Sequence, residues 1–134
     1  MPDAEEKAYS TPPAWTDESA KHKAEKMGCR VEWASDYTLQ LDIDSDADFS
    51  AFEQQLAMLT DLKLIALTEG YSVRRSRSGN RHINIELDDP LDIRDRILFQ
   101  ALLGSDRNRE MLSLAGLIKG QKHPVLFFRP KEGK

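Results

Sequence analysis

The sequence predicts an α+β fold, with an antiparallel or mixed β-sheet and helices packed on one face of it. Short segments in which apolar and polar residues alternate are typical of half-buried strands. Longer segments with apolar residues three and four positions apart are typical of amphipathic helices. The segments follow one another in the order (β)β-α-β-β-α-α-β, which favours a layer of helices on a single sheet.

The length of 134 residues is that of one ordinary domain. Residues 1–16 contain three prolines, three acidic residues and few apolar ones, so we expect a disordered tail there. A single α+β domain should then occupy residues 17–130. The last four residues, 131–134, should be frayed.

The predicted domain begins with a short helix over residues 18–28, which Asp17 or Thr16 can cap and Gly28 can end. The next two segments, CRVEW (29–33) and YTLQLDID (37–44), both alternate between apolar and polar residues. Because only a short turn separates them, we predict that they form a hairpin or one bent strand.

A helix, a strand, a turn and a second strand are predicted in the middle of the chain. Asp48 is expected to cap the helix FSAFEQQLAMLTDL (49–62), whose apolar residues follow helical spacing. A strand should lie within residues 64–77, and SGN (78–80) should turn the chain into the strand HINIELD (82–88).

Two further helices and a last strand are predicted in the C-terminal part. Asp92 should cap IRDRILFQALL (93–103), and Asp106 should cap NREMLSLAGLIKG (108–120). The segment HPVLFFRP (123–130) is typical of a strand that ends at its proline.

Composition excludes several classes of function. The net charge of −4 argues against a generic nucleic-acid coating protein. The chain has no apolar run of about 20 residues and no signal-peptide pattern, so we expect a cytoplasmic protein without membrane partners. The single cysteine, Cys29, has no nearby base in sequence, and His22, His82 and His123 lack metal-ligand spacing.

Two predicted strands each carry polar side chains on one face, because residues two apart in a strand share a face. These side chains are Gln40, Asp42, Asp44, His82, Asn84 and Glu86. If the apolar rows face the helices, the polar rows share the uncovered face. The α-carbons of Asp42 and Asp44 would then be about 6.5 Å apart, close enough to bind one or two divalent ions. Mg²⁺ and Mn²⁺ prefer such oxygen ligands.

A basic segment lies beside this acidic face. It contains four arginines within eight positions, namely Arg74, Arg75, Arg77 and Arg81. The guanidinium group binds phosphate oxygens with two parallel hydrogen bonds, and backbone N–H groups of the turn 78–80 could face an anion. An acidic cluster next to a basic one is typical of a site for a metal–polyphosphate complex.

Structural explanations compete with each of these functional ones. Asp46 and Asp48 are explained first as a turn residue and a helix cap. The segment 78–80 is explained first as a hairpin turn, and the arginines as charges that protect an edge strand. His82 is then an ordinary ion-pair partner of the acidic strand.

With these motifs the chain resembles the archaeo-eukaryotic primase and primase-polymerase superfamily. LDID, with Asp42 and Asp44, is similar to its Asp-x-Asp motif at the end of a strand. SGNRHINIEL is similar to its Ser-x-His strand, with His82 at the histidine. In LGSDRNREMLSLAGLIKG, Asp106 is the best candidate for the later acidic residue. The resemblance covers roughly residues 37–130 and implies an RNA-recognition-like module of a small, phage-type member.

The resemblance implies nucleotidyl transfer that depends on Mg²⁺ or Mn²⁺, with Asp42, Asp44 and Asp106 as catalytic metal ligands. Glu86 and Asp88 are alternatives for the third ligand. The alternative is that the chain is a relative of this family that lacks catalytic activity.

The resemblance implies that His82 and Arg81 contact the triphosphate, and the basic segment and nearby loops add further candidate nucleotide- and phosphate-binding residues. The whole group comprises Ser78, Asn80, Arg81, His82, Arg75, Arg77 and Lys119. Asn80 occupies the position of the family's serine, unless Ser78 serves from the turn. Lys119 lies in a polar loop, where an exposed lysine is also ordinary.

Three functions follow as hypotheses. The first is a primase-polymerase-like nucleotidyltransferase that acts in DNA replication, with nucleoside triphosphates, a single-stranded DNA or RNA template and other replication proteins as partners. The second is a non-catalytic single-strand binding module, for which Tyr37 and Tyr71 are the candidate outward-facing aromatic residues. The third is a small protein-interaction or inhibitor protein, whose partner would contact an acidic loop or one of Phe127 and Phe128.

Overall fold

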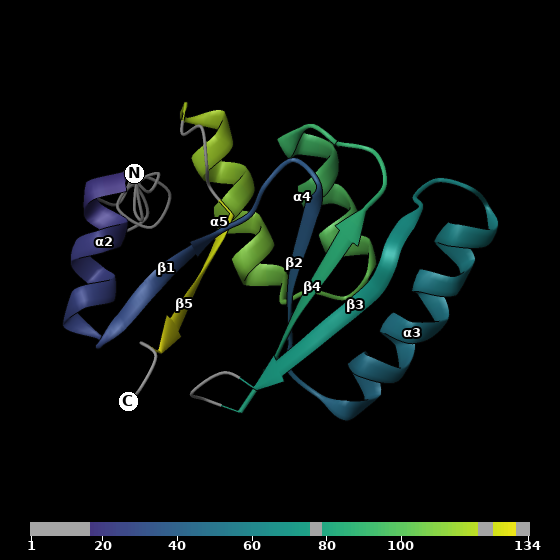
Figure 1. The fold of residues 1–134 in the computed structure, drawn as a ribbon, viewed down its shortest axis with the longest axis horizontal. Coiled ribbons are helices and arrows are strands. Elements are labelled where there is room, and N and C mark those ends of the chain that lie inside the picture. Colours follow the sequence, from purple (N-terminus) through teal and green to yellow (C-terminus); the bar gives the residue numbers. More distant parts are fainter. Residues whose placement is uncertain (1–16, 76–78, 121–124, 131–134) are drawn as a thin grey trace, which may run out of the picture. The chain divides into compact units, whose positions relative to one another are not determined.

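A computed structural model of the chain describes residues 17–75, 79–120 and 125–130. The fold of the described residues is α+β, as predicted, and its strands form two small antiparallel sheets (Figure 1). The predicted tail, 1–16, and the predicted frayed end, 131–134, lie outside the described residues.

The chain divides into two compact units. One, here called the central unit, is Ala34–Glu110, and the other, the terminal unit, combines Met1–Trp33 with Met111–Lys134. The strands therefore belong to two sheets, where the sequence suggested one.

The terminal unit contains helix α2 (Asp17–Lys26) and the antiparallel pair β1 (Cys29–Trp33) and β5 (Leu126–Pro130). Gly28, with a φ of +70°, ends α2, as its position predicted. Helix α5 (Arg107–Ile118) begins in the central unit and continues into this one.

The elements of the central unit follow one another as β-α-β-β-α. They are β2 (Thr38–Ile43), α3 (Asp46–Asp61), β3 (Leu67–Arg75), β4 (Arg81–Leu87) and α4 (Ile93–Leu102). The sheet order is β2-β4-β3, and both pairs are antiparallel. The predicted hairpin of residues 29–33 and 37–44 is wrong, because the first segment pairs with β5 and the second with β4.

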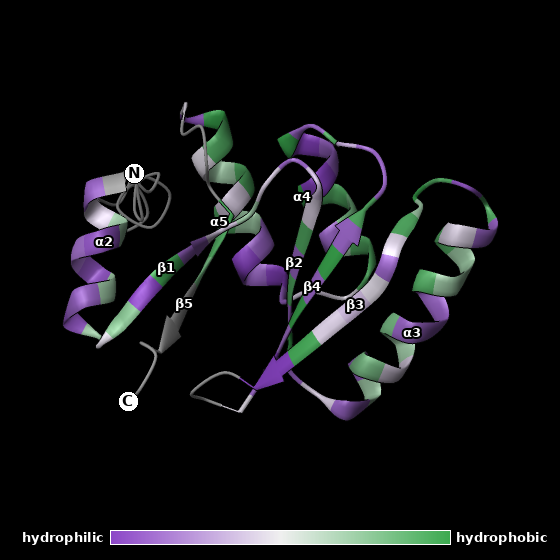
Figure 2. Cartoon of the chain, viewed as in Figure 1, coloured by the Kyte–Doolittle hydropathy of each residue, from purple (hydrophilic) through white to green (hydrophobic). Residues whose placement is uncertain are grey.

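Apolar side chains of β2 and β4 face the helices, as their alternation predicted. Hydrophobic and hydrophilic residues alternate along β4 in Figure 2. The core residues are Leu39, Leu41, Ile43, Phe52, Leu56, Leu59, Ile65, Ile83, Ile85, Leu87 and Leu103. Because α3 and the end of α4 pack on this side, the polar rows of β2 and β4 share the other face.

The N-cap of α4 agrees with the sequence prediction, and that of α3 differs from it. Asp92 caps α4 by accepting a hydrogen bond from the backbone N–H of Asp95, as predicted. The cap of α3 is Ser45 and not Asp48: the Ser45 hydroxyl accepts from the Asp48 N–H at 3.1 Å. Asp48 lies in the first turn instead, where its negative charge faces the positive end of the helix dipole.

Candidate metal and nucleotide site

Asp42 and His82 are direct cross-strand partners in the β2–β4 pair. Their side chains are 22% and 12% exposed, and Nε2 of His82 lies 3.8 Å from Oδ1 of Asp42. This distance is an ion-pair contact but is too long for a hydrogen bond. Oδ1 of Asp42 is buried and has no hydrogen-bond partner in the part of the chain that the structure describes.

Asp106 lies beside Asp42 because the turn between α4 and α5 binds the outer edge of β2. The Asp106 N–H donates to the backbone oxygen of Asp42 at 2.6 Å. The Asp42 N–H donates to the Ser105 hydroxyl at 3.0 Å. Asp106 also caps α5 as predicted, since its carboxylate accepts from the Arg109 N–H at 2.9 Å. Its role as a cap and its place in the acidic cluster are therefore compatible.

The three aspartates influence one another's ionisation. Burial raises the pKa of Asp42 above its ordinary value, Asp106 adds to that rise, and the Arg109 guanidinium opposes it. The pKa of Asp44 is also raised, first by burial and then by the charge of Asp106 and a hydrogen bond to it. Asp42, Asp44 and Asp106 thus form one negative cluster, here called the acidic cluster.

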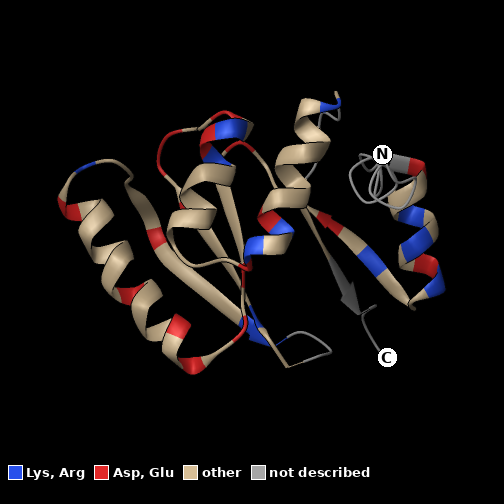
Figure 3. Cartoon of the chain, turned by 180° about the vertical axis from the view of Figure 1, so that it is seen from behind, with Lys and Arg blue, Asp and Glu red and all other residues tan. Residues whose placement is uncertain are grey.

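The residues around the acidic cluster lie on different faces of the sheet. Asn80 lies on the cluster's side, where its side-chain amide donates to Asp44 Oδ1 at 2.9 Å. Arg81 lies on the α3 side, where it pairs with Asp46 and stacks 4.7 Å above the Phe49 ring. Figure 3 shows the acidic start of α3 next to the basic ends of β3 and β4.

Arg74 is the arginine of β3 that shares a face with His82, because the two are cross-strand partners. Arg75 lies opposite Arg81 in the β3–β4 register, and its guanidinium donates a hydrogen bond to the Gly79 carbonyl oxygen at 2.8 Å. The polar face therefore brings His82 together with Arg74, and not with its sequence neighbour Arg81.

Other predicted site residues lie elsewhere. Arg77 and Ser78 fall outside the described residues. Lys119 is exposed and belongs to the terminal unit. The rival ligands Glu86 and Asp88 lie at the opposite end of β4, where they accept hydrogen bonds from threonines at 3.2 and 2.9 Å.

Sequence reasoning did not find a buried polar network behind the acidic cluster. Its centre is Glu110, 3% exposed, whose carboxylate accepts from Gln100, Ser105 and Arg109 at 2.8, 2.7 and 2.6 Å. The network binds β2 through the backbone of Gln40, whose N–H donates to Gln100 and whose oxygen accepts from Arg109. It thereby satisfies the outer edge of β2 and fixes the turn that carries Asp106.

One signal for this network was present in the sequence. Gln100 is a polar residue within the helix 93–103, and it is completely buried in the structure. A buried amide requires partners, so its presence indicates polar groups nearby.

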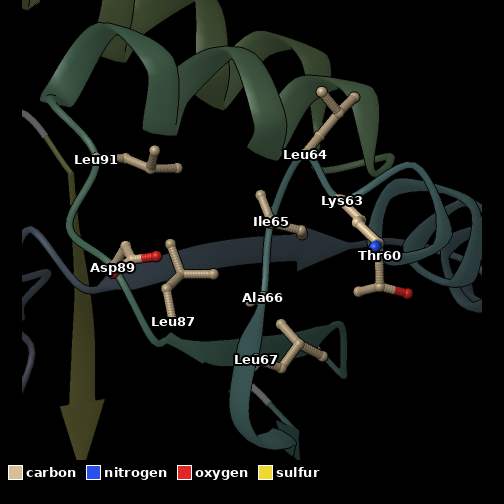
Figure 4. A pocket seen from close by; sticks show the side chains of 9 residues that line it. All are labelled: Thr60, Lys63, Leu64, Ile65, Ala66, Leu67, Leu87, Asp89 and Leu91. Carbon is tan, nitrogen blue, oxygen red and sulfur yellow. The ribbon is translucent and has the colours of Figure 1, made fainter.

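An apolar pocket of about 560 Å³ lies at the far end of the same sheet. Figure 4 shows Leu87, Ile65 and Leu91 around it, with Lys63 and Asp89 as its charged residues. The pocket is next to the Leu67–Leu87 pair, whereas the cross-strand pair of Asp42 and His82 lies at the opposite end of the sheet. It therefore takes no part in the acidic cluster.

The donor set of the acidic cluster suits a hard divalent cation, because it consists of carboxylate oxygens. A cation would also give the buried Oδ1 of Asp42 a partner and offset the mutual repulsion that Asp44 and Asp106 experience. Within the described residues, no group of three or more His, Cys, Asp or Glu side chains is already placed to hold a metal ion. Binding would therefore require these carboxylates to turn toward one another.

Comparison of the chain with protein-family models, with curated proteins and with solved structures finds no match. In the described ranges, no helix has both the length and the apolar character that a membrane crossing needs.

Proposed function

We propose that the chain is a metal-dependent nucleotidyltransferase core of the primase-polymerase kind, which acts on nucleoside triphosphates in DNA replication. The observation that supports this most is the meeting of Asp42, Asp44 and Asp106 beside His82. The end of β2 and the turn before α5 supply the three aspartates, and β4 supplies His82.

In this proposal Asp42, Asp44 and Asp106 hold Mg²⁺ or Mn²⁺. When bound there, such an ion would supply charge stabilisation for an attacking 3′-hydroxyl and for the departing pyrophosphate. His82 and Arg74, which share the polar face, contact the triphosphate. The negatively charged phosphate oxygens can accept hydrogen bonds from these two side chains.

The electrostatics support a site that is incomplete without a cation. The raised pKa values of Asp42 and Asp44 reflect carboxylates that are partly desolvated and close to like charge. Raised carboxylate pKa values of this kind are common at sites where a protein keeps charged groups for binding or catalysis.

The resemblance of LDID and SGNRHINIEL to primase-polymerase motifs supports the choice of reaction. It extends the proposal to a single-stranded template and to other replication proteins as partners. The second hypothesis, a single-strand binding sheet, is less well supported. Tyr71 lies opposite Ile85 and packs against Phe52 with ring centres 5.0 Å apart, so its ring faces α3 and not the polar face. For the third hypothesis, Phe127 is buried, so a partner would contact the acidic loop or Phe128, whose side chain lies outside the described ones.

Primer extension on a single-stranded template, with Mg²⁺ or Mn²⁺ and nucleoside triphosphates, tests the proposal. Wild-type protein should add nucleotides, and Asp42→Ala or Asp44→Ala should abolish the addition while the fold is retained. Asp89→Ala is a matched control, because this aspartate is exposed and lies at the apolar pocket at the far end of the sheet, away from the cluster. A wild-type protein that neither binds a metal–triphosphate complex nor extends a primer overturns the proposal.

A further inference from the structure

A second pocket, of about 850 Å³, lies on the polar face of the central unit. Its walls include Tyr37 before β2, residues 68–70 of β3, and Asn84 and Glu86 of β4. It follows the same row of side chains that begins with His82, because His82, Asn84 and Glu86 share a face. A volume of this size is typical of small-molecule sites.

Asn84 provides a polar atom without a partner at this pocket. Its Oδ1 is buried and accepts no hydrogen bond within the described part of the chain. Buried side-chain oxygens nearly always have a partner, so this one suits a ligand donor such as a hydroxyl or amino group. Asn84 lies two residues from His82, which places the two α-carbons about 7 Å apart along β4.

Charge distinguishes the two ends of the polar face. The pocket is lined by three carboxylate residues, Glu69, Glu86 and Asp88, and none of its lining residues is a lysine or arginine. Phosphate groups would be repelled there, whereas hydroxyl and amino donors would find acceptors. The cationic side chains, Arg74 and Arg109, lie at the other end of the face with His82 and Asp42.

The wall that carries Tyr37 is held in place by hydrogen bonds. The carbonyl oxygen of Tyr37 accepts from the Leu87 N–H at 2.8 Å. The side chain of Arg96 donates to the Ser35 carbonyl oxygen at 2.8 Å. On the opposite wall the β3–β4 register shifts between Leu67 and Tyr71, a bulge that locally opens the sheet. The Tyr37 side chain is 47% exposed, so its ring is available for stacking.

We propose that this pocket binds the nucleoside half of a nucleoside triphosphate, whose phosphates lie at the acidic cluster. The inference rests on the proposed function and adds the ligand's orientation along the sheet. Oδ1 of Asn84 accepts a hydrogen bond from a sugar hydroxyl or a base amino group. The Tyr37 ring stacks on the base, and the pocket's carboxylates exclude the phosphate end.

Calorimetric titration with Mn²⁺ and two kinds of ligand tests the orientation. The ligands are each of the four ribonucleoside triphosphates, used separately, and inorganic tripolyphosphate, which has no nucleoside. Wild-type protein should bind at least one nucleoside triphosphate more tightly than tripolyphosphate. Asn84→Leu, which removes the acceptor and keeps the size, should weaken nucleoside triphosphate binding by about tenfold. It should leave tripolyphosphate binding unchanged.

Tyr37→Ala provides a second variant that does not disturb the core, and it should have the same selective effect. Gln54→Leu, the same type of change on the exposed face of α3, is the matched control and should alter neither affinity. Equal wild-type affinities for all ligands, or unchanged nucleoside triphosphate affinity in both pocket variants, overturn the inference alone. A wild-type protein that binds neither kind of ligand overturns the proposed function as well.

Discussion

Asp42 of β2 lies directly opposite His82 of β4, with the His82 Nε2 3.8 Å from the Asp42 Oδ1. This pairing unites two motifs that are 40 positions apart in the sequence. Burial raises the pKa of Asp42, although the Arg109 guanidinium opposes the rise. The contact therefore places a destabilised carboxylate next to a group that can carry a proton or contact a phosphate.

Asp42→Asn should stabilise the protein at neutral pH. The pKa of Asp42 is above its ordinary value of 3.8 in the folded state, so the stability linked to its protonation is present at low pH. This contribution to stability is lost as the pH rises through the folded-state pKa of Asp42. Asparagine does not ionise, so the variant keeps its stability over the same pH range. Thermal unfolding across pH should show a higher melting temperature for the variant at neutral pH, with a difference that disappears below 3.8.

Asp89→Asn is the control for this pH series, because Asp89 is exposed and lies outside the helices and the acidic cluster. It should change the melting temperature little at any pH. An Asp42→Asn variant that is less stable than wild type at neutral pH would contradict the account of the raised pKa.

Glu110→Gln should destabilise the protein strongly. Glu110 is buried and receives charged hydrogen bonds from Arg109, whose side chain is only 17% exposed. Loss of the carboxylate leaves this guanidinium without its hydrogen-bonded counter-charge, at a cost of about 3–5 kcal/mol in the free energy of unfolding. Urea unfolding measures this change.

Glu53→Gln makes the same substitution on the exposed surface of α3, where Glu53 accepts a hydrogen bond from the Tyr71 hydroxyl. Its free energy of unfolding should fall by no more than about 1 kcal/mol. Equal effects of the two substitutions would show that the buried network does not hold the turn at Asp106.

Leu41→Ala tests the assignment of faces in β2. Leu41 is fully buried among the core residues, whereas its neighbours Gln40 and Asp42 belong to the polar row. The truncation should lower the free energy of unfolding by about 2–5 kcal/mol. Met58→Ala on α3, where the side chain is 61% exposed, should change it by about 0.5 kcal/mol or less. Comparable losses would place Leu41 outside the core.

The faces of the central sheet could be predicted because strand alternation has a period of two. In β2 and β4 this period assigns Leu41 and Ile83 to the core, and Asp42 and His82 to the other face. Caps at Asp92 and Asp106 were also predictable, because each precedes an apolar pattern of helical spacing.

The strand partners of residues 29–33 could not be predicted in the same way. A short alternating segment has the same pattern whichever strand it joins, and the structure pairs it with β5. The cap of α3 was misplaced because the segment SDAD offers several good capping residues in succession, and Ser45 is the one with extended backbone.

The buried network was beyond sequence reasoning for a different reason. Helical periodicity separates apolar from polar positions, and it classes Arg109 and Glu110 as solvated. Their burial depends on the outer edge of β2, whose backbone groups at Gln40 need partners. Such a tertiary requirement leaves no local pattern at Arg109 and Glu110, and the sequence signals it through Gln100 alone.

Thermal unfolding with Mn²⁺ and a nucleoside triphosphate tests for a metal–nucleotide site at the acidic cluster, because a ligand that binds the folded state raises its melting temperature. Wild-type protein should be stabilised by millimolar metal and nucleotide together, and the Asp42→Asn/Asp44→Asn double variant should not be. No increase for the wild-type protein, or an equal increase for the double variant, would contradict a metal–nucleotide site at the acidic cluster.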